Sequence, residues 1–529
     1  MPKHRRLKEP EQDRPSHGSQ HQDRLDAISP PSPLAIPELL QLACQFLDRH
    51  SLAMCVRVCR LWHQALGGQL WKAVEKYIGC KPLDRQKSNG PSLSLISKHA
   101  DFIQNLFLRI PIGDARFPGK SPIHCSRITE LTVDSVGHLE VGHIRRHLDH
   151  GLSTFIEEHQ ASLKKLVLHV SPSKALTDAV TSCSRLESLV TRLPDSEEDL
   201  DWIDWYRSCG SRLQSLALVS RTSGDFTTSF RNSAAIFDTL DELLSRVPAA
   251  TLQSLELEAG CPTLSSLQGQ LLLVMKSPEL KRLSWPGTST IPILAKAFKR
   301  SRHGLFCQEL ESLAIRGGKF TAMDLKCIIE SLPALVDLDL KWSMGDSTPC
   351  QYSPFFIHLG LRRLRIDGSQ WATSTVVHDL LCSMPSLEVM IANEVLDTTI
   401  LEDPRPWICT GLKELMILFR FLSGDEGETL ILNRLCQLKG LEKLSLQAEL
   451  RLLLPPTWND GHLRFRLDHG LDQLKTLRQL RIFEAGHALP WRESEALWAL
   501  ENWTQLREID IKMDASAQQL LGHRLKVKA

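Results

Sequence analysis

Residues 325–340 read LKCIIESLPALVDLDL, and this stretch decides the fold because it holds one complete structural unit. Apolar residues recur at helical spacing over 325–332, and Pro333 then ends the helix because proline cannot continue it. The next segment, 335–340, has the form L-x-x-L-x-L and predicts a strand. Its last two leucines share one face by the two-residue period of a strand, so we expect them in the core and the residue between them facing away.

The same pattern returns about fifteen times, at spacings of roughly 23 to 39 residues. The clearest copies are Leu163-Leu166-Leu168, Leu213-Leu216-Leu218, Leu252-Leu255-Leu257, Leu310-Leu313-Ile315, Leu335-Leu338-Leu340, Leu361-Leu364-Ile366, Leu412-Leu415-Ile417, Leu441-Leu444-Leu446, Leu477-Leu480-Ile482 and Leu506-Ile509-Ile511. Weaker copies stand at Ile103-Leu106-Leu108, Ile128-Leu131-Val133, Leu186-Leu189, Leu280-Leu283-Trp285 and Leu387-Met390-Ala392. Such a period predicts an α/β solenoid, an uneven arc of parallel strands backed by helices. A generic α/β layer protein is the alternative, although glycine-rich phosphate loops are missing from the sequence.

A second informative region precedes the repeats, with the sequence LAIPELLQLACQFLDRHSLAMCVRVCRLWHQALGGQLWKAVEKY over residues 34–77. We expect a first helix from Pro37 and a second one capped by Ser51 and ended by Gly67-Gly68. A third short helix is expected from Leu70 to Tyr77. So small a module encloses a small core, and its large apolar residues exceed what that core can use. The surplus either serves a partner or caps the next domain.

The residues of this region resemble an F-box from end to end. The resemblance is carried by Ile36-Pro37-Glu38-Leu39-Leu40, by Phe46-Leu47, Leu52 and Val56, by Val58-Cys59-Arg60 with Trp62, and by Leu70-Trp71. The repeats resemble the leucine-rich repeats found behind F-boxes, in the divergent form of fungal-type F-box proteins. The asparagine or cysteine that usually follows the strand is mostly absent, and the spacing is often longer than a typical repeat.

This resemblance implies the substrate-recognition adaptor of a Skp–cullin–F-box ubiquitin ligase, a subunit without catalysis of its own. The implied partners are a Skp-type adaptor, through it cullin and RING subunits, and an unknown protein substrate on the repeats. The residues implied in adaptor docking, either at the contact or just beneath it, are Pro37, Leu39, Leu40, Leu47, Leu52, Val56, Val58, Trp62, Leu70 and Trp71. The alternative is a repeat scaffold that binds a Skp-type adaptor or another partner without cullin.

The expected substrate face is the row of residues between the last two core positions of each strand. This row mixes both charge signs with apolar and small residues, and its candidate contacts are Glu256, Asp339, Arg365, Met416 and Arg481. A nucleic-acid groove would be mostly basic with interleaved aromatics, so the mixed row favours a protein or peptide ligand.

Bulk properties and boundaries complete the expectations. Hydrophobic content of 42%, charged content of 24% and a net charge of +1 give no reason to expect nucleic-acid or membrane partners. The fourteen cysteines are scattered and the first residues lack a secretory signal, so we expect a reduced, intracellular protein of the cytoplasm, the nucleus or both. We divide the chain into a disordered tail (1–33), the F-box (34–79), a linker (80–100), the solenoid (101–513) and a C-terminal tail (514–529).

No sequence motif indicates catalysis or a cofactor. The G-x-S-x-G elbow, the P-loop, G-x-G-x-x-G and H-E-x-x-H are all missing. Spacing permits a metal site at His138, His143, His147 and His150, but a solvated helix explains these histidines better. We interpret Cys55 with Cys59 as packing residues, and the acidic run 195–201 as a loop or helix start.

Overall fold

The computed structural model describes residues 36–77, 93–111, 125–136, 142–170, 173–192, 212–219, 249–257, 264–286, 290–301, 307–341, 343–345, 356, 360–420, 424–446, 464–485 and 489–527. The chain separates into two compact units, Met1–Ala73 and Val74–Ala529. We call the described part of the first unit the head.

The head consists of three helices, α1 (Pro37–Cys44), α2 (Arg49–Cys55) and α3 (Arg60–Trp71). Proline begins α1 as expected, at a position where a missing N–H costs nothing. The expected cap of α2 was wrong: Asp48, not Ser51, is the N-cap, and its Oδ1 accepts a hydrogen bond from the Ser51 N–H at 2.7 Å. The short aspartate side chain reaches this amide directly, which leaves Ser51 inside the first turn.

The helix α3 runs through Gly67 and Gly68 instead of ending there, and the expected third helix from Leu70 to Tyr77 was wrong. Residues Ala73–Tyr77 form strand β1. Glycine weakens a helix by about 1 kcal/mol relative to alanine. Here Leu66 is buried and Leu70, one turn on, packs against the same core, so burial on both sides of the glycines outweighs that cost.

The head core is small. Its buried members are Leu40, Cys44, Leu52 and Leu66, and the half-buried residues packed against them are Cys55, Val56, Trp62, Ala65 and Leu70. Four buried side chains are few for an independently folded unit, so the head is a module of modest intrinsic stability.

The second unit is a long run of strands and helices. Its sheet strands, after β1, are β2 (Asn105–Pro111), β3 (Glu130–Val136), β4 (Lys165–Leu168), β5 (Ser188–Arg192), β6 (Ser215–Val219), β7 (Ser254–Leu257), β8 (Arg282–Pro286), β9 (Ser312–Arg316), β11 (Asp337–Asp339), β13 (Arg363–Arg365), β14 (Val389–Asp397), β15 (Glu414–Arg420), β16 (Lys443–Ser445), β17 (Ile482–Glu484), β18 (Glu508–Asp510) and β19 (Lys526–Val527). The helices are α4 (Leu93–Lys98), α5 (Gly142–His159), α6 (Lys174–Ser182), α9 (Leu264–Met275), α10 (Ile291–Ser301), α11 (Ala322–Glu330), α13 (Ser374–Ser383), α14 (Gly424–Leu435), α15 (Glu493–Asn502) and α16 (Ala515–Gly522). Short 3-10 turns are η2 (Ala100–Phe102), η6 (Thr398–Glu402), η8 (Leu467–His469) and η9 (Leu471–Thr476), and β10 (Gly318–Phe320) pairs with β12 (Ser343–Gly345) in a separate small sheet.

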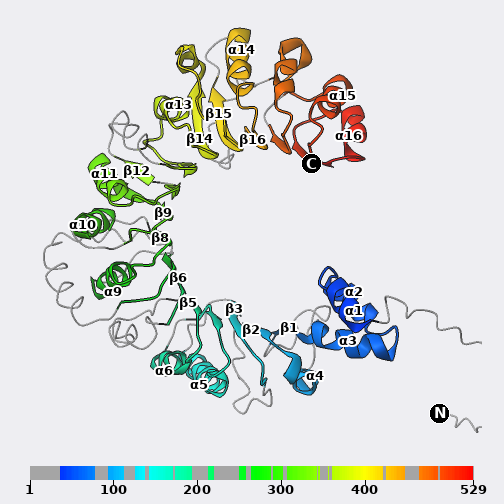
Figure 1. Ribbon diagram of the computed structural model, residues 1–529, viewed down its shortest axis with the longest axis vertical. Coiled ribbons are helices and arrows are strands. Elements are labelled where there is room, and N and C mark those ends of the chain that lie inside the picture. Colours follow the sequence, from blue (N-terminus) through cyan, green and yellow to red (C-terminus); the bar gives the residue numbers. More distant parts are fainter. Residues whose placement is uncertain are drawn as a thin grey trace, which may run out of the picture. The chain divides into compact units, whose positions relative to one another are not determined.

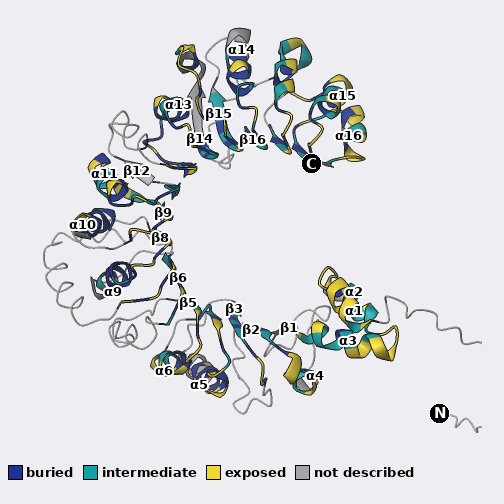
Figure 2. Cartoon of the chain, in the orientation of Figure 1, coloured by how far each residue is buried: buried dark blue, intermediate teal, exposed yellow. Residues whose placement is uncertain are grey.

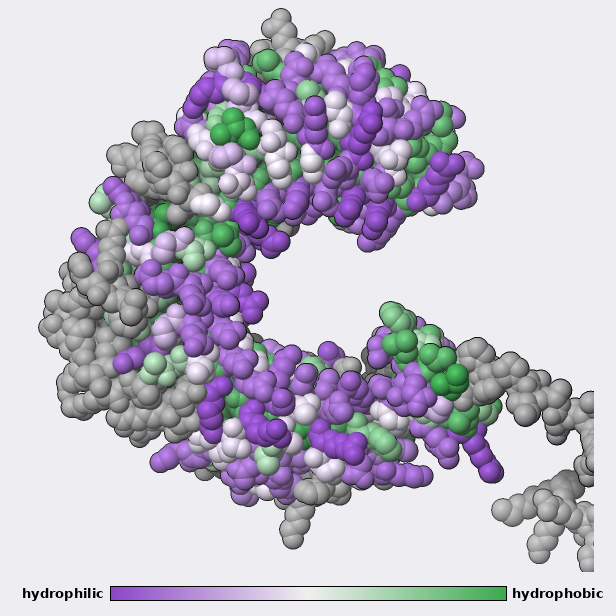
Figure 3. Space-filling model, in the orientation of Figure 1, coloured by the Kyte–Doolittle hydropathy of each residue, from purple (hydrophilic) through white to green (hydrophobic). Residues whose placement is uncertain are grey.

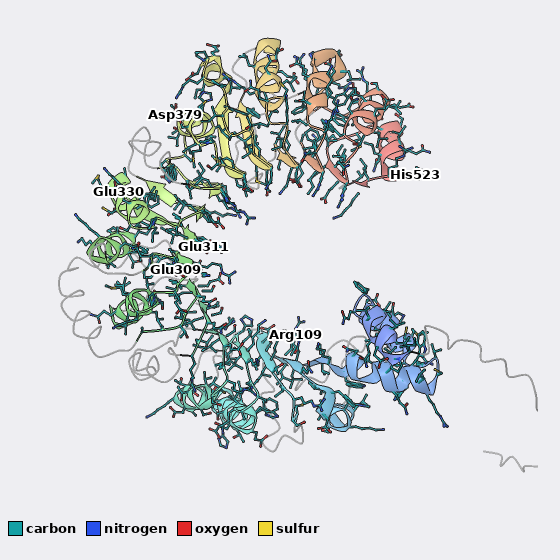
Figure 4. The ribbon with its side chains drawn as sticks, viewed as in Figure 1. Arg109, Glu309, Glu311, Glu330, Asp379 and His523 are labelled. Carbon is teal, nitrogen blue, oxygen red and sulfur yellow. The ribbon has the colours of Figure 1, made fainter. Side chains whose placement is uncertain are left out.

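Within the described residues, 17 strands form one sheet, and from β2 onward each strand pairs in parallel with the next strand of the sheet along the chain. Figure 1 shows the described helices of this unit along one side of the sheet. We call the other side, lined by strands, the open face. In Figure 4, Glu330 on α11 and Asp379 on α13 lie on the helix side, whereas Arg109 and Glu311 lie on the open-face side.

The repeated L-x-x-L-x-L pattern forms the core, as predicted. Leu335, Leu338 and Leu340 are at most 1% exposed, and the weak copy Leu387-Met390-Ala392 is completely buried. In Figure 2 the buried residues follow the strands and the helix surfaces that face them. One strand with its preceding helix or turn therefore makes one repeat, and the second unit is a leucine-rich-repeat solenoid.

One repeat has a different register from the predicted one. Hydrogen-bonded pairing aligns Leu444 with Phe483 and Ser445 with Glu484, so the core positions are Leu480, Phe483 and Ala485, three residues later than the expected triplet 477–482. Both frames begin with a buried leucine, which made the sequence ambiguous. The true frame holds because Phe483 packs against Trp491 and Trp503, with ring centroids 5.8 and 5.1 Å apart.

Two expected boundaries also differ. The region 80–100, expected as a linker, contains helix α4. The region 514–529, expected as a tail, contains α16 and β19, and β19 pairs with β18. The sheet thus continues past residue 513, because Leu521 and Ala517 of α16 are buried as in the earlier repeats. The expected N-terminal tail, 1–33, lies outside the described residues.

Candidate partner-binding surfaces

The head exposes a concentration of apolar side chains. Among the described residues, eight of the fourteen large hydrophobic side chains that are exposed belong to the head: Ile36, Leu39, Leu42, Phe46, Leu47, Met54, Val58 and Leu61. We call these eight residues the head patch. Phe46 is 84% exposed and Val58 is 65% exposed. Figure 3 shows hydrophobic surface over the helices of the head. Side chains of this size are normally covered, so the head patch is a candidate interface.

The structure divides the ten residues expected in adaptor docking into three groups by exposure. Leu40 and Leu52 are buried in the head core. Pro37, Val56, Trp62, Leu70 and Trp71 are half-buried. Leu39, Leu47 and Val58 are exposed and belong to the head patch. A partner therefore has direct access to the last group, whereas the first group acts through the fold of the head.

Sequence reasoning did not place Ile36, Leu42, Phe46, Met54 and Leu61 in the candidate interface, although all five are exposed. Spacing within α1 holds a signal for one of them, Leu42. Leu40 and Cys44, four residues apart, form the buried side of α1, while Leu39 and Leu42, three residues apart, are exposed on another side. Phe46 follows in the turn after the helix. A short helix with two apolar sides has one side left over for a partner.

The start of α2 carries a fixed negative charge close to this surface. The backbone N–H of Ser51 donates to Asp48 and holds the pKa of that carboxyl below its usual value. Asp48 is thus ionised at neutral pH, where it also complements the positive end of the α2 dipole.

On the open face, strand pairing aligns the residues between core positions into one central row. In strand order the row is Phe107, Thr132, Val167, Val190, Ala217, Glu256, Ser284, Ala314, Asp339, Arg365, Ile391, Met416, Ser445, Glu484 and Asp510. Its first five members are uncharged, and both charge signs appear from Glu256 onward. Phe107 also carries the guanidinium of Arg109 over its ring at 5.1 Å.

Four of the five candidate substrate contacts lie in the central row, namely Glu256, Asp339, Arg365 and Met416. The placement of Arg481 in this row was wrong. Arg481 precedes β17, and its side chain forms an ion pair with Glu442 of the neighbouring repeat at 3.0 Å. The three-residue shift of the repeat frame explains this difference, because it places Glu484 in the central row instead.

Two of these candidates take part in an ion-pair network across β9, β11 and β13. Asp339 pairs with Arg316 at 3.5 Å, and Arg365 contacts Asp367 at 2.5 Å. Asp367 is 1% exposed and also contacts Lys341 at 3.3 Å. A buried carboxylate requires such cations, so part of the charge of Arg365 stabilises the fold.

A cysteine, a histidine and an aspartate meet beside α13, but their chemistry does not make a nucleophile. His378 Nε2 lies 3.4 Å from Cys382 Sγ and 3.7 Å from Asp403 Oδ2. The indole N–H of Trp407 donates to His378 Nδ1, so the proton of a neutral ring is on Nε2 and the ring cannot accept one from the thiol. Burial raises the pKa of Cys382 and lowers that of His378. Both groups are therefore neutral packing residues at neutral pH.

The residues that the structure describes contain no group of three or more His, Cys, Asp or Glu side chains arranged to hold a metal ion. His143, His147 and His150 lie on α5, but the side chains of the first two, like all of His138, fall outside the description. The acidic run 195–201 is also outside it. Among the described helices, none is both long and apolar enough to cross a bilayer.

No protein-family model and no curated protein matches this sequence. Solved structures resemble the fold. A leucine-rich-repeat protein of Leptospira interrogans is 14% identical over 86% of this chain and 94% of its own, with a TM-score of 0.33. An internalin of Listeria monocytogenes is 10% identical over 82% and 88%, with a TM-score of 0.30. The Rad7 and Elc1 complex of yeast contains a chain 14% identical over 72% and 87%, with a TM-score of 0.38. These likenesses concern the fold alone.

Proposed function

We propose that this protein is the substrate-recognition adaptor of a Skp–cullin–F-box ubiquitin ligase, in which the head is the F-box. The observation that carries the proposal is the head patch, eight exposed large hydrophobic residues on three short helices and the turns that flank them. The F-box resemblance of these same helices names the partner as a Skp-type adaptor. A module of this size suits an interface of standard extent, about 1,200–2,000 Å² in total.

The head has the two layers that a docking module needs. Leu40, Leu52 and Leu66 hold the helices together from within, and the head patch leaves aromatic and aliphatic side chains on the surface. Phe46 is the most exposed of them and the only aromatic member of the head patch. Binding energy in interfaces concentrates in a few such anchors, so Phe46 and Val58 are the expected centre of docking.

The repeats supply the other half of the proposed function. The strands of the open face align a row of fifteen residues with apolar, small and charged members, of which Ser445 and Ala217 are buried, and this mixture suits a protein substrate. In this role the chain transfers no ubiquitin itself. It holds the substrate near the charged conjugating enzyme and so raises the effective concentration of the acceptor lysine.

The test is capture of a Skp-type adaptor by the full-length chain. Phe46→Ala combined with Val58→Ala is expected to abolish co-purification, because both side chains are exposed and contribute little to the head core. The matched control is Met323→Ala with Leu497→Ala, two exposed hydrophobic residues of the repeats, 60% and 44% exposed. Trp62→Ala is a poorer test because Trp62 packs against the core. Capture that survives the head double mutant would overturn the docking assignment.

The same capture separates the ligase from a scaffold role. In a ligase, cullin and a RING subunit join the complex together with the Skp-type adaptor, and both disappear with the head double mutant. If the adaptor is captured without cullin at every salt concentration tried, the chain is a repeat scaffold that uses the adaptor alone.

A further inference from the structure

A second aligned row runs along the open face, two residues before the central row in each strand. We call it the flanking row. Its members are Asn105, Glu130, Lys165, Ser188, Ser215, Ser254, Arg282, Ser312, Asp337, Arg363, Val389, Glu414, Lys443, Ile482, Glu508 and Lys526.

Four of the five cations in the flanking row stand beside a carboxylate in the same row. Lys165 contacts Glu130 at 4.0 Å, Lys443 contacts Glu414 at 2.6 Å and Lys526 contacts Glu508 at 3.7 Å. The fourth, Arg363, is aligned with Asp337 and lowers the pKa of that carboxyl against the larger effect of burial. Charge in this row is thus balanced between neighbouring strands.

Arg282 is the exception. Its neighbours in the flanking row are Ser254 on β7 and Ser312 on β9, and the hydroxyl of Ser312 donates to Asp337 on the next strand. Within the part of the chain that the structure describes, the guanidinium of Arg282 makes no ion pair and is exposed. Small residues on both sides leave it open to an approaching group.

Lys281 adds a second exposed cation immediately before Arg282. Its nearest aligned acidic residue is Glu311, but among the described residues no ion pair of 4.0 Å or less joins Lys281 to a carboxylate. The backbone under both side chains is fixed, because the amides of Lys281 and Arg282 donate to the carbonyl of Gln253 and the Lys281 carbonyl accepts from two amides of the next repeat. The start of β8 is therefore a rigid base that presents two cations, neither of which forms an ion pair with another described residue, although Glu311 lies immediately before the neighbouring strand β9.

The side chains on the strands before β8 constrain the shape and charge of any ligand that also contacts Arg282. On β5, β6 and β7 the flanking row offers only Ser188, Ser215 and Ser254, and the central row offers Val190 and Ala217. Short side chains let a peptide backbone approach the sheet closely. Glu256 lies on β7 in the central row, diagonally across from Arg282, and disfavours a run of several negative charges.

We propose that Arg282 and Lys281 bind an acidic side chain of an extended cargo peptide, whose neighbouring small or apolar residues lie on β5–β7. This inference deepens the proposed function, since it names the chemistry of the cargo at the open face. Nucleic acid fits less well, because its regular phosphates require a track of cations and the other cations of the flanking row are matched by carboxylates.

The experiment measures binding of fluorescent peptides to the full-length protein by anisotropy at low salt. The probes are alternating Glu-Ala, Gln-Ala and Lys-Ala peptides of about twelve residues, long enough to cross several strands, and an oligo-dT of matching charge. The Glu-Ala peptide is expected to bind best, with an affinity that falls as salt rises. Arg282→Glu with Lys281→Glu is expected to weaken it by about tenfold or more and to favour the Lys-Ala peptide.

The matched control is Lys443→Gln, which removes a cation of the same row that is already paired with Glu414. This variant is expected to change binding of the Glu-Ala peptide by less than about twofold. Equal binding of the Glu-Ala and Gln-Ala peptides, equal losses in the two variants, or stronger binding of oligo-dT would each overturn the proposal. Capture of the Skp-type adaptor is measured on the same variants and is expected to be unchanged, so a failure at β8 is distinguishable from a failure of the head assignment.

Discussion

The head and the repeats treat their large apolar residues in opposite ways. In the repeats, the aligned leucines of the strands are almost completely buried, from Leu106 to Ile509, and so are the helix residues that face them. In the head, four side chains are buried while eight large ones are exposed, in a module of three short helices and the turns that flank them. The repeats therefore use hydrophobic residues for their own stability, whereas the head leaves most of its large hydrophobic side chains exposed.

This difference has an energetic consequence. Each repeat stabilises its neighbours through a continuous core and main-chain pairing between strands. The neighbouring repeats therefore continue to support a repeat that a substitution has destabilised. The head has only its own small core, and in the proposed function a bound adaptor would add stability by binding the folded form. The two units should thus respond differently to equivalent substitutions.

The largest expected effect is that of Leu66→Ala. Leu66 is completely buried in the four-residue core of the head, and a buried leucine-to-alanine change costs about 2–5 kcal/mol. A module this small has too little free energy of unfolding to absorb that loss. We expect amides of α1, α2 and α3 to lose protection in hydrogen exchange on the full-length chain, with the repeats unchanged. Leu61→Ala, on the same helix but 36% exposed, is the control and should keep protection; loss of protection in both variants would contradict the division into core and patch.

The same substitution in a repeat should have a smaller, local outcome. Leu338 is completely buried at the centre of β11, and Leu338→Ala again costs about 2–5 kcal/mol. Because β11 pairs with β9 and β13, we expect faster exchange in these three strands while β2–β6 keep their protection. Met323→Ala on α11, 60% exposed, should leave exchange unchanged. Global unfolding by the first variant would show that the repeats behave as a single cooperative unit.

The smallest effect compares two similar helix starts. Asp48 accepts a hydrogen bond from the Ser51 N–H at 2.7 Å, and Asp514 accepts one from the Ala517 N–H at 2.8 Å. These hydrogen bonds hold the pKa values of both carboxyl groups below normal. Each therefore stabilises its helix above about pH 3.9, the unfolded value, and loses this as pH falls through the folded-state pKa. Acidification should open α2 before α16, because the head has less core to compensate.

Helix-resolved hydrogen exchange against pH measures this order. Asp48→Asn is the control, since asparagine keeps a capping oxygen but does not titrate, and it should remove the acid sensitivity of α2. An unchanged pH profile in this variant would mean that another group controls α2.

The sequence predicted the repeats well because the pattern and the burial share one physical cause. A strand with leucines at fixed spacing has few other ways to bury them, so even weak copies such as Leu387-Met390-Ala392 were placed correctly. Prediction of the frame was wrong in one repeat, where two frames each begin with a leucine that is buried. Leu477 and Leu480 are both buried, and only the aromatic contacts of Phe483 with later tryptophans decide the frame.

The candidate sites were predicted less completely, for a related reason. The order of apolar residues in the head indicated a docking module, but it could not separate Leu40, which is buried, from Leu39, which is exposed, because helix orientation depends on packing between helices. The sequence equally could not show that Arg282 forms no ion pair with another described residue. That depends on which residues of two other repeats stand beside Arg282, and this is known only once the register is known.

The pairing of each strand with its sequence neighbours has one more consequence. One repeat, a strand and the helix before it, is the smallest segment of this unit that can be inserted or deleted without changing the others. After either event every remaining strand still pairs with the strand of another repeat. Lineages of such chains can therefore change length by duplication and deletion, and each event adds or removes a few contact positions without altering those already in use.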